Sequence, residues 1–268
     1  MAPDVAAAGG AALDAEVGSA LAALDIAALE ATYWEQGEFL FLPRFLAPAT
    51  VARLLADVDR LEPGLNRNYI PRHKKGGSVS HFDIAAGGLA VLALYRSAAL
   101  RAALAQIVRA PLQLCPDEDP HACALYFYTE PGDHMGYHYD TSYYRGARYT
   151  VLIGLVQASA SRLLCRLHTR EPGQAPRDLE VETAPGSLVL FNGDAVYHGV
   201  SPSRAGDRRV VLTLEYVTSQ EMGRVQRAFS SLKDAFAYFG VRSLWQAHRR
   251  RAAAGPVSPT TGGPARSS

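Results

Sequence analysis

The chain has 268 residues, of which 48% are hydrophobic, and its formal net charge at pH 7 is +1. A chain of this length can bury a sizeable core, and the nearly balanced charge argues against a binder of nucleic acid or another polyanion. The three cysteines are an odd number without paired spacing, which predicts reduced thiols. The start lacks the features of a signal peptide and no apolar run has the length of a membrane span, so we expect a cytoplasmic protein without a membrane partner.

The first part of the chain predicts helices around a short strand. Residues 1–12 are rich in alanine and glycine, and we expect this stretch to be disordered. Apolar residues then recur at helical spacing over 13–36, which predicts one helix. A short strand is expected within 38–46. Pro48 then opens a helix that runs to Leu61, because proline suits a first helical turn.

The segment 66–88 shows no regular period. It is rich in glycine, serine and basic residues, and Arg72 is one of its cations. So long a connection inside a compact domain is typical of a lid or binding loop, and we predict that it orders over a substrate. The alternative is a solvated surface turn. Helical spacing returns over 89–110, which predicts a further helix.

Short strand-like segments dominate from residue 112 onward. They are bounded by Pro, Gly and Asp turns, and most lie too close together for helical crossovers. This pattern predicts a mainly β fold with flanking helices, in which the strands form an antiparallel double-sheet jelly roll instead of a doubly wound α/β sheet. We expect the core at about 112–218, a covering helix over 219–239 and a disordered tail over 246–268.

Three residues have the pattern of metal ligands. His138 and Asp140 are two positions apart, so on an extended strand their side chains project from the same face. His198 follows much later in the chain, after a turn and an apolar strand. Two histidines and one carboxylate on one side of a metal, with the other side open, are typical of the facial triad of non-haem Fe(II) oxygenases. The sequence therefore predicts a metal site formed by these three residues.

Two adjacent arginines follow the last predicted ligand. A guanidinium can hold a dicarboxylate co-substrate through paired charge-assisted hydrogen bonds. Strand alternation places Arg209, Thr213 and Glu215 on one face, and that face is the more polar one. Arg208 belongs to the opposite face. We therefore favour Arg209 as the anion-binding residue and keep Arg208 as the alternative.

The combined pattern resembles the Fe(II)/2-oxoglutarate-dependent oxygenases, and among them the prolyl-hydroxylase-like branch. It covers about residues 38–218. The features that carry it are Tyr128, the turn Pro131-Gly132-Asp133, His138-Tyr-Asp140, the strand 186–191, His198-Gly-Val-x-Pro202 and Gly206-x-Arg208.

This resemblance implies a cofactor, two co-substrates and a reaction. Fe(II) would be held by His138, Asp140 and His198, and 2-oxoglutarate and O2 would be consumed while succinate and CO2 are released. It also implies a double-stranded β-helix core, of the jelly-roll or cupin-like kind, and we expect a single oxygenase domain over 13–245. Tyr128 stands where that branch has a tyrosine touching the co-substrate, and a core tyrosine is the alternative. Related halogenases lack the carboxylate ligand, so the presence of Asp140 favours hydroxylation or another halide-free oxidation.

We expect the substrate to be a small carboxylate-bearing metabolite, most simply a free amino acid or a derivative. Arg72 offers a planar guanidinium for its carboxylate, and Thr213 and Glu215 can receive its ammonium group. This pairing resembles the free-amino-acid hydroxylases and halogenases of the same superfamily. The alternatives are a surface role for Arg72 with Glu215 paired to a nearby arginine, a peptide or protein hydroxylase, and a non-catalytic jelly-roll binding protein. The oligomeric state stays open.

Overall fold

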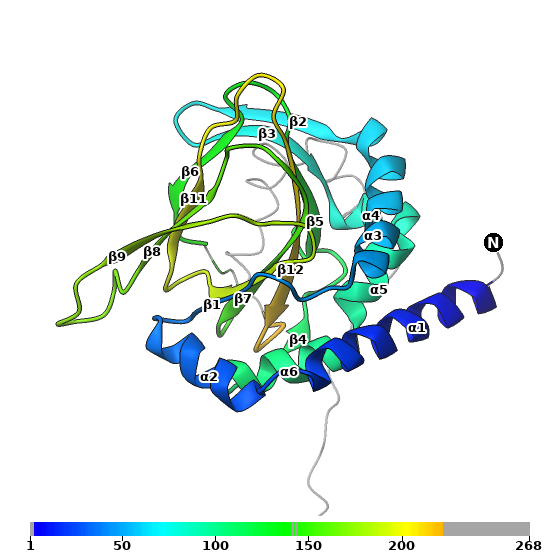
Figure 1. Cartoon of the computed structure of the whole chain (residues 1–268), viewed down its shortest axis with the longest axis horizontal. Helices are drawn as coiled ribbons and strands as arrows, with labels where there is room; N and C mark the ends of the chain where they lie inside the picture. The colour runs from blue at the N-terminus through cyan, green and yellow to red at the C-terminus, as the bar shows by residue number, and fades with distance from the viewer. Residues whose placement is uncertain (1–2, 141, 143, 222–268) are drawn as a thin grey trace, which may run out of the picture.

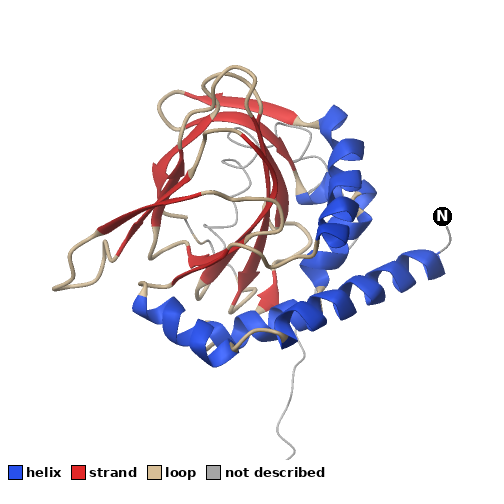
Figure 2. Ribbon diagram, in the orientation of Figure 1, coloured by secondary structure: helices blue, strands red, loops and turns tan. Residues whose placement is uncertain are grey.

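The strands form one antiparallel sheet that curls around the interior of the molecule, and helices cover its outside (Figures 1 and 2). The structure is a computed structural model, and it describes residues 3–140, 142 and 144–221. The order of the strands in the sheet is β1-β10-β7-β12-β5-β3-β6-β11-β8-β9, while β2 pairs with β3 and β4 pairs with β12. The predicted jelly-roll fold with flanking helices is thereby confirmed.

All the described helices lie in the first part of the chain, interrupted only by β1 and by the pair β2 and β3, and only strands follow α6. The helices are α1 (Pro3–Ala22), α2 (Ile26–Glu35), α3 (Pro48–Leu61), α4 (His81–Gly87), α5 (Leu89–Arg96) and α6 (Ala98–Ile107), with a 3-10 turn at Glu62–Gly64. The strands are β1 (Phe39–Leu42), β2 (Asn66–Ile70), β3 (Lys74–Val79), β4 (Gln113–Leu114), β5 (Cys123–Tyr128), β6 (His134–His138), β7 (Arg148–Ala158), β8 (Leu163–Leu167), β9 (Arg177–Val181), β10 (Leu188–Asn192), β11 (Tyr197–Val200) and β12 (Arg208–Val217).

The N-terminal helices differ from the prediction in extent. Helix α1 begins at Pro3, so the expected disorder of 1–12 is wrong for residues 3–12, and the abundant alanine of this stretch has the highest helix propensity. The helix predicted over 13–36 is two helices, because the side chain of Asp25 accepts a hydrogen bond from Ala28 N and starts α2. The helix predicted over 89–110 is likewise split, and Ser97 caps α6 by accepting from Leu100 N.

The segment 66–88 is not a long loop. Strands β2 and β3 form a hairpin there, α4 follows, and β3 lies within the curled sheet between β5 and β6. A Cβ on Gly77 would lie 2.9 Å from Leu65 Cδ1, so this glycine permits close packing of the hairpin. The prediction of a lid is therefore wrong for this segment, since its backbone pairs with the sheet that forms the core.

Two apolar clusters divide the interior. The larger lies between the helices and the sheet and includes Leu54, Leu94, Leu104 and Leu212. The smaller lies inside the curl of the sheet and surrounds the site described below.

All three cysteines are buried, and none forms a disulfide. Within the described residues no single helix is long and apolar enough to cross a membrane, although the bent pair α5 and α6 passes that test when taken together. The predicted C-terminal helix and tail lie outside the described residues, apart from residues 219–221.

Candidate functional site

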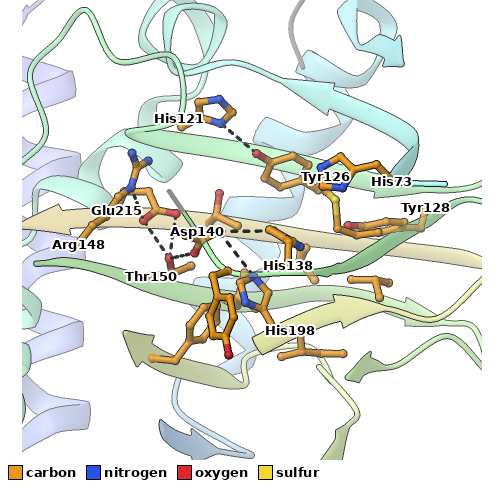
Figure 3. Close-up of a pocket in the computed structure, with 18 of the residues that line it drawn as sticks. His73, His121, Tyr126, Tyr128, His138, Asp140, Arg148, Thr150, His198 and Glu215 are labelled. Atoms are coloured by element: carbon orange, nitrogen blue, oxygen red, sulfur yellow. Dashed lines mark hydrogen bonds and ion pairs between the residues drawn. The ribbon is translucent and has the colours of Figure 1, made fainter. Parts of the chain in front are cut away.

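His138, Asp140 and His198 meet inside the curled sheet, and Figure 3 shows their side chains converging. One potential ligand atom from each residue lies within 4.8 Å of the other two. His138 Nε2 is 3.5 Å from Asp140 Oδ1, and His198 Nε2 is 3.7 Å from the same oxygen. Among the described residues, these three form the group of His, Cys, Asp or Glu side chains whose spacing can hold a metal ion. The sequence-predicted metal site is thus assembled in space.

Strand pairing brings the two imidazoles together. His138 at the end of β6 pairs directly with His198 on β11. His138 Nδ1 lies 2.9 Å from Gly136 O, and His198 Nδ1 lies 3.1 Å from Val196 O. A carbonyl oxygen only accepts, so each Nδ1 carries the proton and each Nε2 keeps a lone pair for a metal.

Asp140 is held from two sides. Its backbone N donates to Gly193 O at 3.0 Å, and its Oδ2 accepts from Thr150 Oγ1 at 3.1 Å. A Cβ on residue 193 would lie 2.4 Å from Asp140 Oδ2, so only glycine lets the chain approach this carboxylate. The carboxylate is thereby oriented by backbone packing as well as by a hydroxyl.

The electrostatics of the triad favour an ionised Asp140 carboxylate and a neutral His198 imidazole. Burial of Asp140 raises the pKa of its carboxyl group, but the nearby His198 and His138 outweigh burial and hold that pKa well below its usual range. Burial lowers the pKa of His198, and the attraction of Asp140 only partly opposes this effect. Both states are the ones in which these groups bind a metal.

The three residues open onto a cavity of about 340 Å³. Its wall combines apolar side chains of the smaller core cluster with polar groups at both ends. The lining residues are His73, His121, Tyr126, Tyr128, Met135, His138, Tyr139, Asp140, Arg148, Thr150, Leu152, Leu163, Phe191, His198, Val200, Arg209, Val211, Thr213 and Glu215. A concave, mostly apolar pocket with a few convergent polar groups is the usual form of a small-molecule site.

Arg209 and Arg208 point to opposite sides of β12. The Arg209 side chain is fully buried and lines the cavity, and its Nη1 and Nη2 have no hydrogen-bond partner in the described part of the chain. Its Nε donates to Thr183 Oγ1, and its Cζ lies 5.1 Å from the centre of the Tyr128 ring. Arg208 instead pairs with Glu62 through two contacts of 2.7 Å outside the cavity. The sequence pattern favours Arg209 over Arg208 because alternate residues of a strand face opposite sides. The structure shows this alternation, with Arg209 facing the cavity and Arg208 facing Glu62.

Glu215 stands at the other end of the cavity wall, in a network of buried charges. Its Oε2 accepts from Arg148 Nε at 3.0 Å, and Arg148 Nη1 reaches Asp119 Oδ2 at 3.4 Å. Asp119 also accepts a hydrogen bond from the Tyr144 hydroxyl at 2.7 Å. Burial raises the pKa of Glu215 to about 8, even though Arg148 and Thr150 act in the opposite direction. Pairing of Glu215 with a nearby arginine is the alternative that the sequence left open, and the structure shows this pairing with Arg148. The Glu215 side chain also lines the cavity.

The structure separates the remaining substrate-binding candidates. Thr213 lines the cavity, and its hydroxyl donates to Ala124 O at 3.2 Å. Arg72 lies at the exposed turn between β2 and β3 with φ of +63°, outside the cavity lining. The geometry does not support Arg72 as the substrate-carboxylate residue, because the hairpin directs its neighbour His73 to the cavity instead.

Sequence reasoning missed the network behind Glu215. Arg148, Asp119 and Thr150 stand in no recognisable motif, and Asp119 is 29 positions from Arg148 and 25 positions from Tyr144 in the chain. One signal was available for Arg148 and Thr150, because alternation along β7 places them with Leu152 on a single face. No comparable signal marks Asp119, which lies in an irregular segment before β5.

No family model matches the sequence, and no curated protein matches it. Solved structures do match. The alpha-ketoglutarate (2-oxoglutarate) dependent epimerase SnoN from nogalamycin biosynthesis aligns with a TM-score of 0.62 and 16% identity over 77% of this chain and 88% of that chain. A Trichoplax adhaerens prolyl hydroxylase in complex with a peptide fragment of the hypoxia inducible factor oxygen degradation domain has a TM-score of 0.58 and 17% identity over 75% and 90% of the two chains. A Pseudomonas putida prolyl-4-hydroxylase has a TM-score of 0.55 and 20% identity over 74% and 100%.

The chain has the fold of the 2-oxoglutarate/Fe(II) oxygenases. At these identities the likeness shows the fold, and the site must be judged on its own residues. Two imidazoles and one carboxylate suit Fe(II) and leave one side of the ion open. The buried Arg209 guanidinium, with two unpartnered nitrogens facing the same cavity, suits the far carboxylate of 2-oxoglutarate. The residues present therefore fit both the metal and the co-substrate of this oxygenase fold.

Proposed function

We propose that this protein is an Fe(II)/2-oxoglutarate-dependent oxygenase that hydroxylates a small molecule. The observation that carries the proposal is the pairing, in one cavity, of the His138, Asp140 and His198 cluster with the buried Arg209 guanidinium. A metal held only for structure would be saturated by protein ligands, whereas three ligands beside an unpaired arginine leave room for a co-substrate.

Each residue has a defined task in this proposal. His138, Asp140 and His198 hold Fe(II), and Arg209 holds the far carboxylate of 2-oxoglutarate, with Tyr128 packed beside the guanidinium. Bound Fe(II) together with 2-oxoglutarate and O2 supplies the oxidation of a substrate C–H bond, coupled to decarboxylation to succinate. The apolar wall excludes water from that chemistry. The intact carboxylate ligand Asp140 leaves no position for a halide, which favours hydroxylation over halogenation.

The class of substrate we favour is a small carboxylate-bearing metabolite, most simply a free amino acid or a close derivative. The cavity of about 340 Å³ holds the co-substrate as well, so only a small substrate fits beside it. Glu215 and Thr213 offer acceptors for an ammonium group at the end away from Arg209. Arg148 takes the place that Arg72 had in the sequence-based hypothesis, because it is the arginine that lines this end of the cavity. A zwitterion can then place its ammonium on Glu215 and its carboxylate on Arg148.

A peptide or protein substrate is the second candidate. It is favoured by the structural likeness to a prolyl hydroxylase in complex with a peptide fragment. The two candidates differ in what must enter the cavity, since a peptide presents one side chain and leaves its backbone outside, whereas a free amino acid enters whole.

Anaerobic reconstitution with Fe(II) and 2-oxoglutarate, followed by O2 and a panel of metabolites and peptides, tests the proposal by mass spectrometry. We expect succinate in stoichiometric amounts with a product heavier by one oxygen atom, from a free amino acid or derivative. His138→Ala, Asp140→Ala and His198→Ala should each abolish coupled succinate formation, because the site loses one of its three ligands. Succinate with peptides alone would select the second candidate. Failure to form succinate with any compound, together with failure to bind Fe(II), would leave a non-catalytic binding protein.

A further inference from the structure

The Thr150 hydroxyl lies between two carboxylates, and Figure 3 shows it between Glu215 and Asp140. Thr150 Oγ1 is 3.1 Å from Asp140 Oδ2, 3.0 Å from Glu215 Oε2 and 3.2 Å from Glu215 Oε1. A hydroxyl has one proton to donate, and ionised carboxylates only accept. While both carboxylates are ionised, the hydroxyl therefore cannot donate to Asp140 and Glu215 at the same time through its one hydrogen.

The position of this hydroxyl is well defined by its surroundings. Thr150 is 4% exposed and pairs directly with Glu215 across β7 and β12. A buried β-branched side chain on a paired strand has few rotamers available. The choice open to the hydroxyl is thus the direction of its proton, toward the metal-binding triad or toward the substrate end of the cavity.

We propose that Thr150 is a positioning residue that couples the substrate end of the cavity to the metal ligand Asp140. A substrate ammonium on the Glu215 carboxylate offsets its negative charge and weakens it as an acceptor, so the hydroxyl then donates mainly to Asp140 Oδ2. This inference rests on the proposed function, because it takes Asp140 as a metal ligand and Glu215 as a wall of the substrate site. It adds a physical link by which an occupied substrate site changes the orientation of a metal ligand.

The link predicts a particular pattern of metal affinity. Some residues do not bind the metal but donate a hydrogen bond that orients a metal ligand. Loss of such a hydrogen bond typically weakens metal binding by about 10- to 100-fold. Removal of the hydroxyl by Thr150→Val, which keeps the shape of the side chain, should therefore weaken metal binding by about that factor. Thr150→Ser keeps the hydroxyl and should stay within about threefold of the wild type.

The test for coupling is a double-mutant cycle between Thr150 and Glu215, measured on the full chain with Co(II) as an air-stable probe. Co(II) affinity and the visible absorption spectrum of bound Co(II) are measured above pH 8, where Glu215 is ionised, for wild type, Thr150→Val, Glu215→Gln and the double variant. Glu215→Gln replaces the acceptor-only carboxylate by an amide whose NH2 group can donate to the Thr150 oxygen and free the Thr150 proton for Asp140. It also removes one nearby negative charge, and that charge effect is common to both backgrounds. We expect the effect of Glu215→Gln on Co(II) affinity to differ by threefold or more between the Thr150 and Thr150→Val backgrounds.

The outcomes separate this inference from the proposed function. Equal effects of Glu215→Gln in the two backgrounds, or an unchanged Co(II) affinity in Thr150→Val, would overturn the coupling while leaving the metal site intact. A Thr150→Ser variant that binds Co(II) as weakly as Thr150→Val would also overturn it, because the hydroxyl would then have no special part. Wild type that binds Co(II) no better than His198→Ala would instead contradict the proposed function. Thermal unfolding of each variant confirms that folding is retained.

Discussion

At the scale of single residues, two neighbouring arginines have different surroundings and different expected roles. Arg209 is fully buried, its Nη1 and Nη2 have no hydrogen-bond partner among the described residues, and burial lowers its pKa although the neighbouring Tyr128 acts in the opposite direction. Arg208 is partly exposed and pairs with Glu62. A buried cation without a counter-charge is costly, so its presence indicates an anionic ligand.

The first prediction compares these two arginines. Arg209→Ala should weaken 2-oxoglutarate binding by about 10- to 100-fold, because each hydrogen bond to a charged group contributes about 1.5–3 kcal/mol. Arg208→Ala should leave that affinity unchanged and lower the free energy of unfolding by less than about 1 kcal/mol, as expected for a partly exposed ion pair. Calorimetric titration of the Co(II)-loaded variants with 2-oxoglutarate measures both. Weaker binding in Arg208→Ala alone would reverse the assignment.

The second prediction concerns pH and Glu215. Burial raises the pKa of this carboxyl group from an ordinary value of 4.5 to about 8 in the folded protein. Between these values the unfolded state releases the proton while the folded state keeps it, so rising pH favours unfolding. Without metal, the wild type should lose thermal stability relative to Glu215→Gln as pH rises from about 5 to about 8, and the difference should then level off. Midpoints of thermal unfolding at several pH values measure it. A parallel pH dependence in the two proteins would argue against the raised pKa.

At the scale of elements, the contact between β7 and the turn before β10 holds the co-substrate end of the cavity. Gly154 on β7 donates a backbone hydrogen bond to Ser187 O and accepts one from Gly186 N. A Cβ on Gly154 would lie 2.2 Å from Ala184 O and 2.3 Å from Thr183 O. The Thr183 hydroxyl accepts a hydrogen bond from Arg209 Nε. The close contact between Gly154 and the backbone of residues 183 and 184 therefore helps to set the position of the Arg209 guanidinium.

The third prediction follows from that approach. Gly154→Ala should lower the free energy of unfolding by about 1–3 kcal/mol or more, because overpacking against fixed backbone atoms forces the turn to move. It should also weaken 2-oxoglutarate binding, since Thr183 moves with the turn. Urea unfolding and co-substrate titration measure the two effects. Gly64→Ala is the matched control, because a Cβ at residue 64 would meet no atom within 4 Å. Equal stability of the two variants would contradict the close approach.

At the scale of the whole molecule, we expect the fold to form without the metal. The larger core cluster lies between the helices and the sheet, away from the triad, and its residues are apolar. The metal-binding residues lie on β6, just after it and on β11, which are already joined by backbone pairing. Removal of the metal should therefore leave the secondary structure intact.

The fourth prediction is the linked change in stability. At a free Co(II) concentration 100 times its dissociation constant, binding adds about 2.7 kcal/mol, which corresponds to a rise of roughly 5–10 °C in the midpoint of thermal unfolding. A chelator should reverse the rise without changing the far-ultraviolet circular dichroism. The His198→Ala variant should unfold cooperatively and show little of this rise. Loss of folded structure on chelation would show that the metal is needed to build the fold.

The sequence by itself determined the class of fold and the residues of the metal site. Apolar strands of period two, bounded by turn residues, are local signals, and so is the two-residue spacing of His138 and Asp140 on one strand face. The choice of Arg209 over Arg208 also follows from alternation within one strand. The strand pattern, the spacing of His138 and Asp140 and the alternation along β12 agree with the geometry because each depends on neighbours within a few positions of the chain, whereas His198 was joined to them by the resemblance of the whole motif.

Only the tertiary structure decided which distant residues share the cavity. The segment 66–88 has no period of its own, yet β3 is extended because β5 and β6 supply its hydrogen-bond partners. That pairing leaves Arg72 at an exposed turn and turns His73 toward the cavity. Arg148, Asp119 and Glu215 meet because strands far apart in the chain pack side by side. Charge pairs and cavities of this kind depend on long-range packing, for which a local pattern carries no signal.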